Sequence, residues 1–191
     1  MNSYIHNCEC YPFLENLPDK SVDLVLTDPP YDFEYVAKRD YHQQFQRVCR
    51  GSIIVFSPPE NQWILPADQY LFWTKPISTK NICKSYSRFV EMIFIYGRGS
   101  WNNNRHWSNY VNVFPDYVDD ASEHPFRKPL SLLTRLILNH SNIGDIVLDP
   151  FAGSGATLEA AKMNGRKYIG CEKDPDYFQI AQNHLVKGLS S

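Results

Sequence analysis

A glycine-rich turn between an apolar run and a helical pattern is the feature that most restricts the fold of this 191-residue chain. The segment 146–159 reads IVLDPFAGSGATLE, in which the apolar run ends at Asp149 and the glycines follow. Glycine lets the backbone approach a ligand closely, and the helix behind it presents free N–H groups. About 20 residues further on, the next apolar run ends in an acid, Glu172, which can accept hydrogen bonds from ribose hydroxyls. The sequence therefore predicts a nucleoside-binding unit.

The glycine-rich turn alone does not determine which nucleoside is bound. Gly153 and Gly155 correspond to the first two glycines of the dinucleotide fingerprint, but Leu158 stands where the third would be. A single GxG pair is common where helices begin, so it is also compatible with a purely structural turn. Glu172 favours a functional site without choosing between NAD and another nucleoside cofactor.

Short apolar runs alternate with helical patterns along the whole chain. The runs predicted as buried strands are 21–27, 52–57, 69–74, 89–96, 145–148 and 167–171. The predicted helices are 130–139, 157–164 and 176–185, two of which precede a glycine. This alternation predicts one α/β domain over residues 1–191, with a doubly wound, mostly parallel sheet. No apolar run approaches the length of a membrane span.

A second motif follows the first predicted strand, where the chain reads TDPPY at 27–31. Neither proline can donate a ladder hydrogen bond, so the strand has to stop there. Asp28 offers a carboxylate acceptor, Pro29 a backbone carbonyl, and Pro30 adds no competing N–H. Taken alone, the segment fits a plain strand followed by a proline turn equally well.

Positive charge gathers in one segment of a chain whose formal net charge is −2. Between residues 75 and 107 a single acid, Glu91, stands against six basic residues: Lys75, Lys80, Lys84, Arg88, Arg98 and Arg105. Charge runs commonly form solvated faces, but here aromatic residues interleave with them. The combination predicts a track for phosphates, with double-stranded DNA as the partner.

The run WNNNRHW at 101–107 is the candidate for reading bases. Asparagine pairs two-fold with adenine and arginine with guanine, so Asn103, Asn104 and Arg105 are the residues of interest. The same letters also fit an asparagine-rich turn. We expect a small recognition insertion at 99–123 beside a basic loop at 75–88. Because each good base contact contributes only about 1–3 kcal/mol, this predicts a short site, weak specificity, or a homodimer that shares the reading.

Taken in order, DPPY, HPFRKP, DPFAGSG and the acid after the next strand resemble the amino-group DNA methyltransferases of the beta arrangement. In that family the catalytic motif precedes the cofactor motif, and the resemblance covers most of the chain. It implies a Rossmann-like methyltransferase fold with S-adenosylmethionine as cofactor. It further implies methyl transfer to the exocyclic N6 amino group of adenine in DNA, with N4 of cytosine as the first alternative.

The resemblance also implies roles for individual residues. Asp28, Pro29, Pro30 and Tyr31 would form the catalytic motif. The residues that would border the cofactor are Asp149, Phe151, Ala152, Gly153, Ser154 and Gly155, with Glu172 on the ribose and Lys128 near the methionine end. Many relatives carry Gly-Asp where this chain has Asn7 and Cys8, so the acid that can contact the adenine of the cofactor is replaced here.

Other classes of protein explain fewer of these motifs. Methyltransferases that modify protein glutamine share an Asn-Pro-Pro-Tyr form but place the cofactor motif first. An NAD-dependent oxidoreductase would account for the glycine turn and Glu172, but not for DPPY or the basic segment. A non-catalytic DNA-binding module would have no need of an intact Asp28 and Tyr31.

Cysteine usage predicts the compartment. The five cysteines are an odd number and include no CxxC pair, and residues 1–10 lack the apolar stretch of a secretion signal. We therefore expect a reduced, cytoplasmic protein of a bacterial or phage-infected cell that binds no metal.

Overall fold

A computed structural model describes residues 2–30, 35–58, 66–75, 90–97, 112–115 and 127–187. These residues form one sheet of eight strands in the order β1-β8-β7-β2-β3-β5-β4-β6. The strands are β1 (Tyr4–Asn7), β2 (Val22–Thr27), β3 (Cys49–Ser57), β4 (Gln69–Thr74), β5 (Val90–Tyr96), β6 (Val113–Pro115), β7 (Ile146–Asp149) and β8 (Lys167–Glu172). The helices are α1 (Cys10–Glu15), α2 (Tyr35–Val48), α3 (Leu130–His140), α4 (Ala156–Met163) and α5 (Pro175–Lys187).

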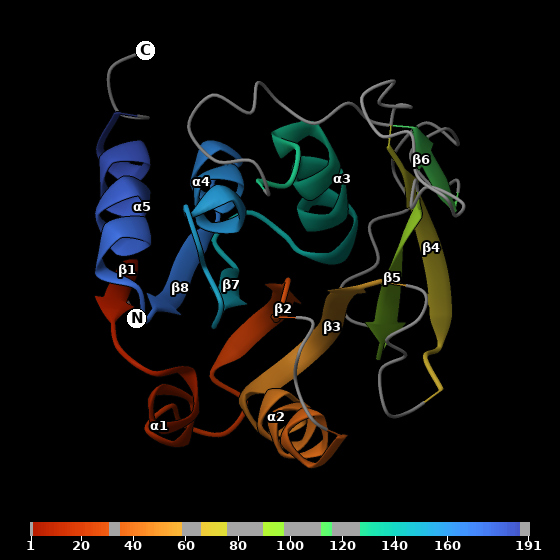
Figure 1. Ribbon diagram of the computed structural model, residues 1–191, viewed down its shortest axis with the longest axis horizontal. Coiled ribbons are helices and arrows are strands. Elements are labelled where there is room, and N and C mark those ends of the chain that lie inside the picture. The colour runs from red at the N-terminus through yellow and green to blue at the C-terminus, as the bar shows by residue number, and fades with distance from the viewer. Residues whose placement is uncertain are drawn as a thin grey trace, which may run out of the picture.

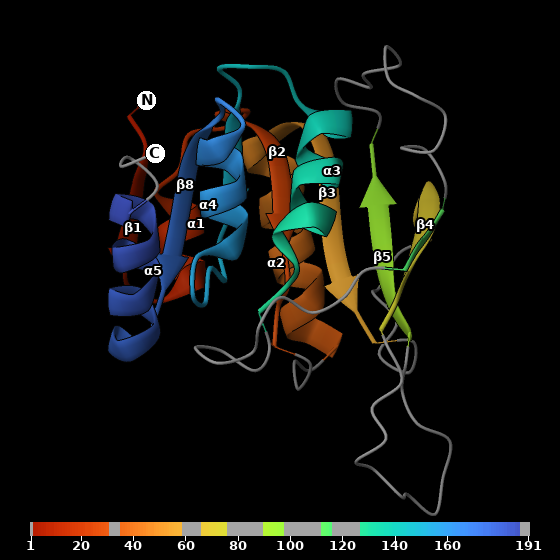
Figure 2. The same cartoon turned by 90° about the horizontal axis from the view of Figure 1, so that it is seen from above.

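The sheet is parallel from β1 through β3 and changes direction at β5. Strands β1, β8, β7, β2 and β3 pair in parallel, whereas β5 runs antiparallel to both β3 and β4. Figure 2 shows this reversal, with the arrow of β5 opposite to those of β2 and β3. The predicted α/β fold with a mostly parallel, doubly wound sheet is therefore confirmed.

Helices cover both faces of the sheet, with α1 and α2 on one side and α3, α4 and α5 on the other (Figure 1). Strand β2 shows why both faces need cover, because successive side chains of a strand point to opposite faces. Leu24 and Leu26 pack in the cluster that includes α3 and α4, and Val25 packs in the cluster that includes α1 and α2. All three are fully buried, as expected of a parallel strand between two helical layers.

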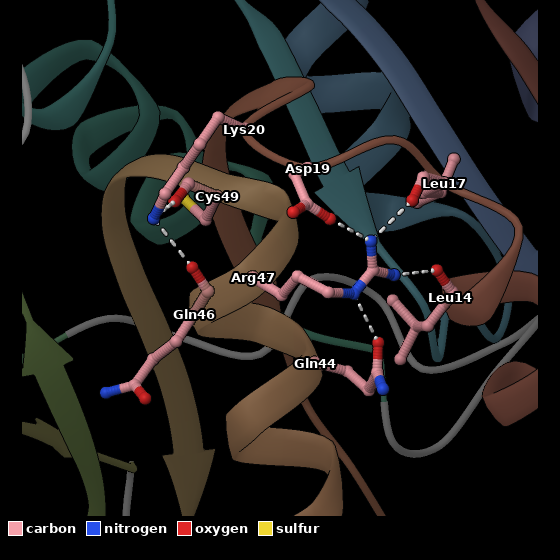
Figure 3. A network of polar contacts seen from close by, with 8 residues as sticks. All are labelled: Leu14, Leu17, Asp19, Lys20, Gln44, Gln46, Arg47 and Cys49. Atoms are coloured by element: carbon pink, nitrogen blue, oxygen red, sulfur yellow. Dashed lines mark hydrogen bonds and ion pairs between the residues drawn. The ribbon is translucent and has the colours of Figure 1, made fainter.

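Arg47 ties the first layer of helices together (Figure 3). From the last turn of α2 its guanidinium donates to the carbonyl oxygens of Leu14, at 2.6 Å, and Leu17, at 2.7 Å. The same group pairs with Asp19 at 2.7 Å and donates to Gln44 at 2.9 Å. Carbonyl groups at the end of a helix lack intrahelical donors, so Arg47 supplies partners at the end of α1.

The six predicted strands and three predicted helices are all present, with boundaries shifted by a few residues. Four elements were not anticipated: β1, α1, α2 and β6. The sequence of α2, YVAKRDYHQQFQRV, is largely polar, and among its residues 40–48 the buried side chains are His42, Phe45 and Val48. Strand β6 lies inside the expected insertion at 99–123 and pairs in parallel with β4, so these three residues belong to the sheet.

The remainder of the basic loop and of the insertion lies outside the described residues. Within the part of the chain that is described, no helix is long and apolar enough to cross a membrane. The carboxyl ends of β2, β7 and β8 lie next to one another on one edge of the sheet, because these strands are parallel neighbours. In open α/β sheets ligands bind in the crevice beyond such ends.

Candidate active site

A cavity of about 660 Å³ opens where β2, β7 and β8 end. It brings together residues from both predicted motifs, although more than 100 residues separate these motifs in the sequence. The predicted site residues in its wall are Cys8, Asp28, Pro29, Pro30, Lys75, Lys128, Asp149, Phe151, Ala152, Gly153, Ser154 and Glu172. The acceptor motif and the glycine-rich turn therefore face one common space.

Two backbone amides hold the Glu172 carboxylate in place at the end of β8. Gly153 donates its N–H to Oε2 at 2.7 Å, and Asp174 donates to Oε1 at 2.9 Å. A carboxylate oxygen has two acceptor positions, so each oxygen keeps one for a further donor. The fixed carboxylate suits a pair of ribose hydroxyls.

Asn7 serves the end of the same strand rather than the cavity. Its side-chain amide donates to the carbonyl oxygens of Glu172, at 2.8 Å, and Lys173, at 3.1 Å. The next residue, Cys8, donates its backbone N–H to Glu172 O at 3.1 Å and does line the cavity. Burial and the neighbouring Cys171 raise the pKa of the Cys8 thiol to about 11, so the thiol is neutral at physiological pH.

Asp149 links the ends of β7 and β2. Its Oδ1 accepts a hydrogen bond from the Thr27 hydroxyl at 2.7 Å and another from the Phe151 N–H at 3.1 Å. The residue is only 3% exposed, and this burial raises its pKa to about 6, against the lowering effect of the hydrogen bonds. Asp28 adds to the rise as a second nearby acid. Asp149 thus joins the two motifs at the floor of the cavity.

Asp28 stands at the end of a row of alternating charges. Lys128 forms an ion pair with Asp28, and its ammonium also lies 3.2 Å from Oε2 of Glu91. Glu91 in turn pairs with Lys75. The Lys128 ammonium lies against two aromatic rings, 5.2 Å from the centre of Phe56 and 5.6 Å from that of Trp73.

Comparison with known proteins shows that the chain is similar to DNA methyltransferases. The sequence pattern of the family described as DNA methylase matches residues 98–183. The type II methyltransferase M2.LlaDCHI of Lactococcus lactis subsp. cremoris is 25% identical over 99% of this chain and 91% of its own length. The DNA adenine methyltransferase YhdJ of Escherichia coli (strain K12) is 26% identical over 90% of this chain and 79% of its own.

Solved structures with a similar fold are also methyltransferases. The crystal structure of the M1.HpyAVI–SAM complex superposes with a TM-score of 0.73 at 26% identity, covering 94% of this chain and 98% of that one. In sequence over nearly its whole length, and in fold, the chain is similar to DNA methyltransferases. The PvuII DNA methyltransferase, named as cytosine-N4-specific, superposes at 0.76 with only 16% identity, which shows the shared fold alone.

Two predicted site residues have neighbours that the sequence did not indicate. Lys75, predicted to contact DNA, lies in the cavity wall on Glu91, with its ammonium 4.8 Å from the centre of the Trp73 ring. Gly155 does not line the cavity. Its φ of +82° starts α4, and a Cβ there would come within 2.9 Å of the Ala181 Cβ on α5.

The described residues leave other predictions open. Tyr31 falls outside them, as do the remaining predicted DNA contacts: Lys80, Lys84, Arg88, Arg98, Asn103, Asn104 and Arg105. Among the residues that are described, no group of three or more His, Cys, Asp or Glu side chains is placed to hold a metal ion.

The cavity also contains residues that the sequence analysis missed. Tyr41 packs edge-on against Phe151, with ring centres 5.3 Å apart, and forms an aromatic wall. Arg127 lines the cavity, pairs with Glu159 and lies 2.6 Å from Nδ1 of His184. Glu91 did leave a signal, because it is the only charged residue in the apolar run FVEMIFIY.

Proposed function

We propose that this protein transfers a methyl group from S-adenosylmethionine to the exocyclic N6 amino group of adenine in DNA. The observation that carries the proposal is the shared cavity, which is lined both by the DPP segment and by the glycine-rich turn with Glu172. The relative YhdJ, whose name states adenine as its substrate, supports the choice of base.

The residues of the cavity fit this cofactor. Glu172, fixed by two backbone amides, offers acceptor positions for the ribose hydroxyls. Lys128 and Arg127 are cations in the same wall and suit the carboxylate of the methionine moiety. Tyr41 and Phe151 supply apolar surface. When bound, the cofactor supplies an electrophilic methyl group on a sulfonium sulfur, so the protein has mainly to align the reactants.

The DPP segment prepares the acceptor nitrogen. The lone pair of an exocyclic amino group is delocalised into the ring, which makes the nitrogen a poor nucleophile. The Asp28 carboxylate and the Pro29 carbonyl accept the two amino hydrogens and favour a tetrahedral nitrogen with a localised lone pair. Pro30 has no N–H to compete for either acceptor. Asp28 acts chiefly as a hydrogen-bond acceptor, and the methylated amine then loses its proton.

DNA contact is assigned to the basic segments. Lys80, Lys84, Arg88 and Arg98 would meet phosphates, Asn103, Asn104 and Arg105 would read bases, and Tyr31 would stack on the target base. The alignment with M2.LlaDCHI runs over 250 positions, although this chain has only 191 residues, so that relative carries insertions. We further propose a short recognition site, or its sharing within a homodimer, and a place in the cytoplasm of a bacterial or phage-infected cell.

The test is to incubate the protein with DNA and methyl-labelled S-adenosylmethionine, digest the DNA to nucleosides, and identify the labelled one by mass spectrometry. We expect labelled N6-methyladenine. Labelled N4-methylcytosine would overturn the assignment of the base but keep the chemistry. Absence of label from a folded protein that binds the cofactor would overturn the proposal.

A further inference from the structure

Glu91 occupies an unusual place for an acid. It lies in the apolar strand β5, opposite Trp73 of β4, and is only 7% exposed. A carboxylate so far from water is costly unless cations compensate it. Two do, because Lys75 pairs with Oε1 and the Lys128 ammonium lies 3.2 Å from Oε2.

Aromatic rings lie against both cations, although 31% of the Lys75 side chain stays exposed and only Lys128 is buried. The Lys75 ammonium lies 4.8 Å from the Trp73 ring centre, and Lys128, with 9% of its side chain exposed, lies between Trp73 and Phe56. Charges interact more strongly in such surroundings than in water. Lys75, Glu91, Lys128 and Asp28 together carry two positive and two negative charges, so the row is neutral.

Lys128 therefore interacts with two carboxylates: that of Asp28, which has a proposed role in the chemistry, and that of Glu91, which has none so far. An ammonium has three donors, and every donor directed at Asp28 competes there with the amino group of the target base. The Glu91 carboxylate, 3.2 Å from the same ammonium, attracts it by charge, which weakens its hold on Asp28 and fixes the direction of the lysine. Pro30 removes a backbone competitor for the same acceptor, so both features serve one purpose.

We propose that Glu91 is a positioning residue for methyl transfer, which shares Lys128 with Asp28 and thereby leaves the Asp28 carboxylate able to accept from the target amino group. This inference rests on the proposed function. It assigns the residue a role through charge rather than through shape, and the two roles can be separated by substitution.

The experiment compares Glu91→Gln with Glu91→Asp in the full chain. Glutamine keeps the size of the side chain and loses its charge, whereas aspartate keeps the charge and is one methylene shorter. We measure kcat for methyl transfer to DNA, cofactor affinity by calorimetry, and thermal unfolding. We expect Glu91→Gln to lower kcat roughly ten- to hundredfold, the effect of one charge-assisted hydrogen bond. Glu91→Asp should keep more activity, and cofactor affinity should stay close to that of the wild type.

A matched control is Asp23→Asn. Asp23, with 16% of its side chain exposed, is likewise a carboxylate in an ion pair, here with Arg50. It accepts from the Ile146 N–H at 2.9 Å and does not line the cavity. This substitution should lower the unfolding temperature and leave kcat unchanged.

Other results would overturn the inference. They are an unchanged kcat in Glu91→Gln, an activity of Glu91→Asp below that of Glu91→Gln, or equal losses of kcat and cofactor affinity. A wild-type protein that binds the cofactor yet methylates no DNA would instead overturn the proposed function, and the inference with it.

Discussion

Lys128 forms an ion pair with Asp28, a residue 100 positions earlier in the chain. The pair joins the loop before α3 to the end of β2 and so connects the segment HPFRKP to the DPPY motif. Neither motif alone forms the site. The site forms because the fold brings the loop before α3 next to the end of β2.

Replacement of Asp28 by alanine should abolish methyl transfer and leave cofactor binding largely intact. The reason is that the carboxylate accepts from the target amino group, whereas Glu172 and the glycine turn hold the nucleoside. Labelled-methyl incorporation and calorimetry with the cofactor measure the two effects separately. Equal loss of both would make Asp28 a cofactor-binding or folding residue.

Replacement of Lys128 by methionine should destabilise the protein by about 3–5 kcal/mol, because it leaves the carboxylates of Asp28 and Glu91 without the cation between them. Denaturant unfolding at neutral pH measures this. Lys162→Met is the control, since the Lys162 ammonium on α4 donates to the carbonyl oxygen of Leu185 on α5. Similar losses in the two variants would contradict the expectation.

Gly155→Ala and Gly144→Ala separate backbone strain from close packing. Both glycines have positive φ, +82° and +86°, so alanine should cost about 1–2 kcal/mol at either position. Only at Gly155 would the new Cβ also press on Ala181, at 2.9 Å, while nothing lies within 4 Å at Gly144. We expect Gly155→Ala to cost about 1–3 kcal/mol more in unfolding free energy. Equal costs would mean that α4 and α5 move apart easily.

The buried Asp149 predicts a pH dependence of stability. Its pKa rises from 3.8 to about 6 on folding, so the folded state holds the proton more tightly than the unfolded state does. Stability attributable to Asp149 is thus greatest below pH 4 and is lost as the pH rises towards 6, by roughly 3 kcal/mol in total.

Asparagine at position 149 isolates this effect, because its oxygen can still accept from Thr27 and Phe151. The unfolding free energy of the wild type minus that of Asp149→Asn should fall between pH 4 and pH 6 and stay constant above pH 7. The contributions of other titrating groups are common to both proteins. A difference that is flat with pH would show that the pKa of Asp149 does not change on folding.

The sequence predicted well those features that depend on neighbours along the chain. Asp149 and Glu172 could be identified because each ends an apolar run next to a turn or helix, and the sheet places both in the cavity. Helix α2 was missed because its apolar stripe is narrow. The sequence shows the charge of Lys75 but not that β5 brings Glu91 beside it. It shows Gly155 in the glycine-rich turn but not its contact with Ala181 on α5, which is likewise non-local. The predicted roles of these two residues at DNA and at the cofactor stay predictions.

Because β5 runs antiparallel to β4, the segment that joins these two strands can change with little effect on the sheet. Because β4 and β5 are antiparallel neighbours, Thr74 lies opposite Val90, and this end of the pair is the one at which Lys75 and Glu91 meet the cavity. A connecting segment of almost any length can leave and rejoin the sheet there, since the entropy of closing a loop grows only slowly with its length. A segment exchanged at this junction would replace the basic loop for which we propose contacts with DNA phosphates, and the residues that line the cavity would stay as they are. The strength of DNA binding could therefore change without a change in the residues that carry out methyl transfer.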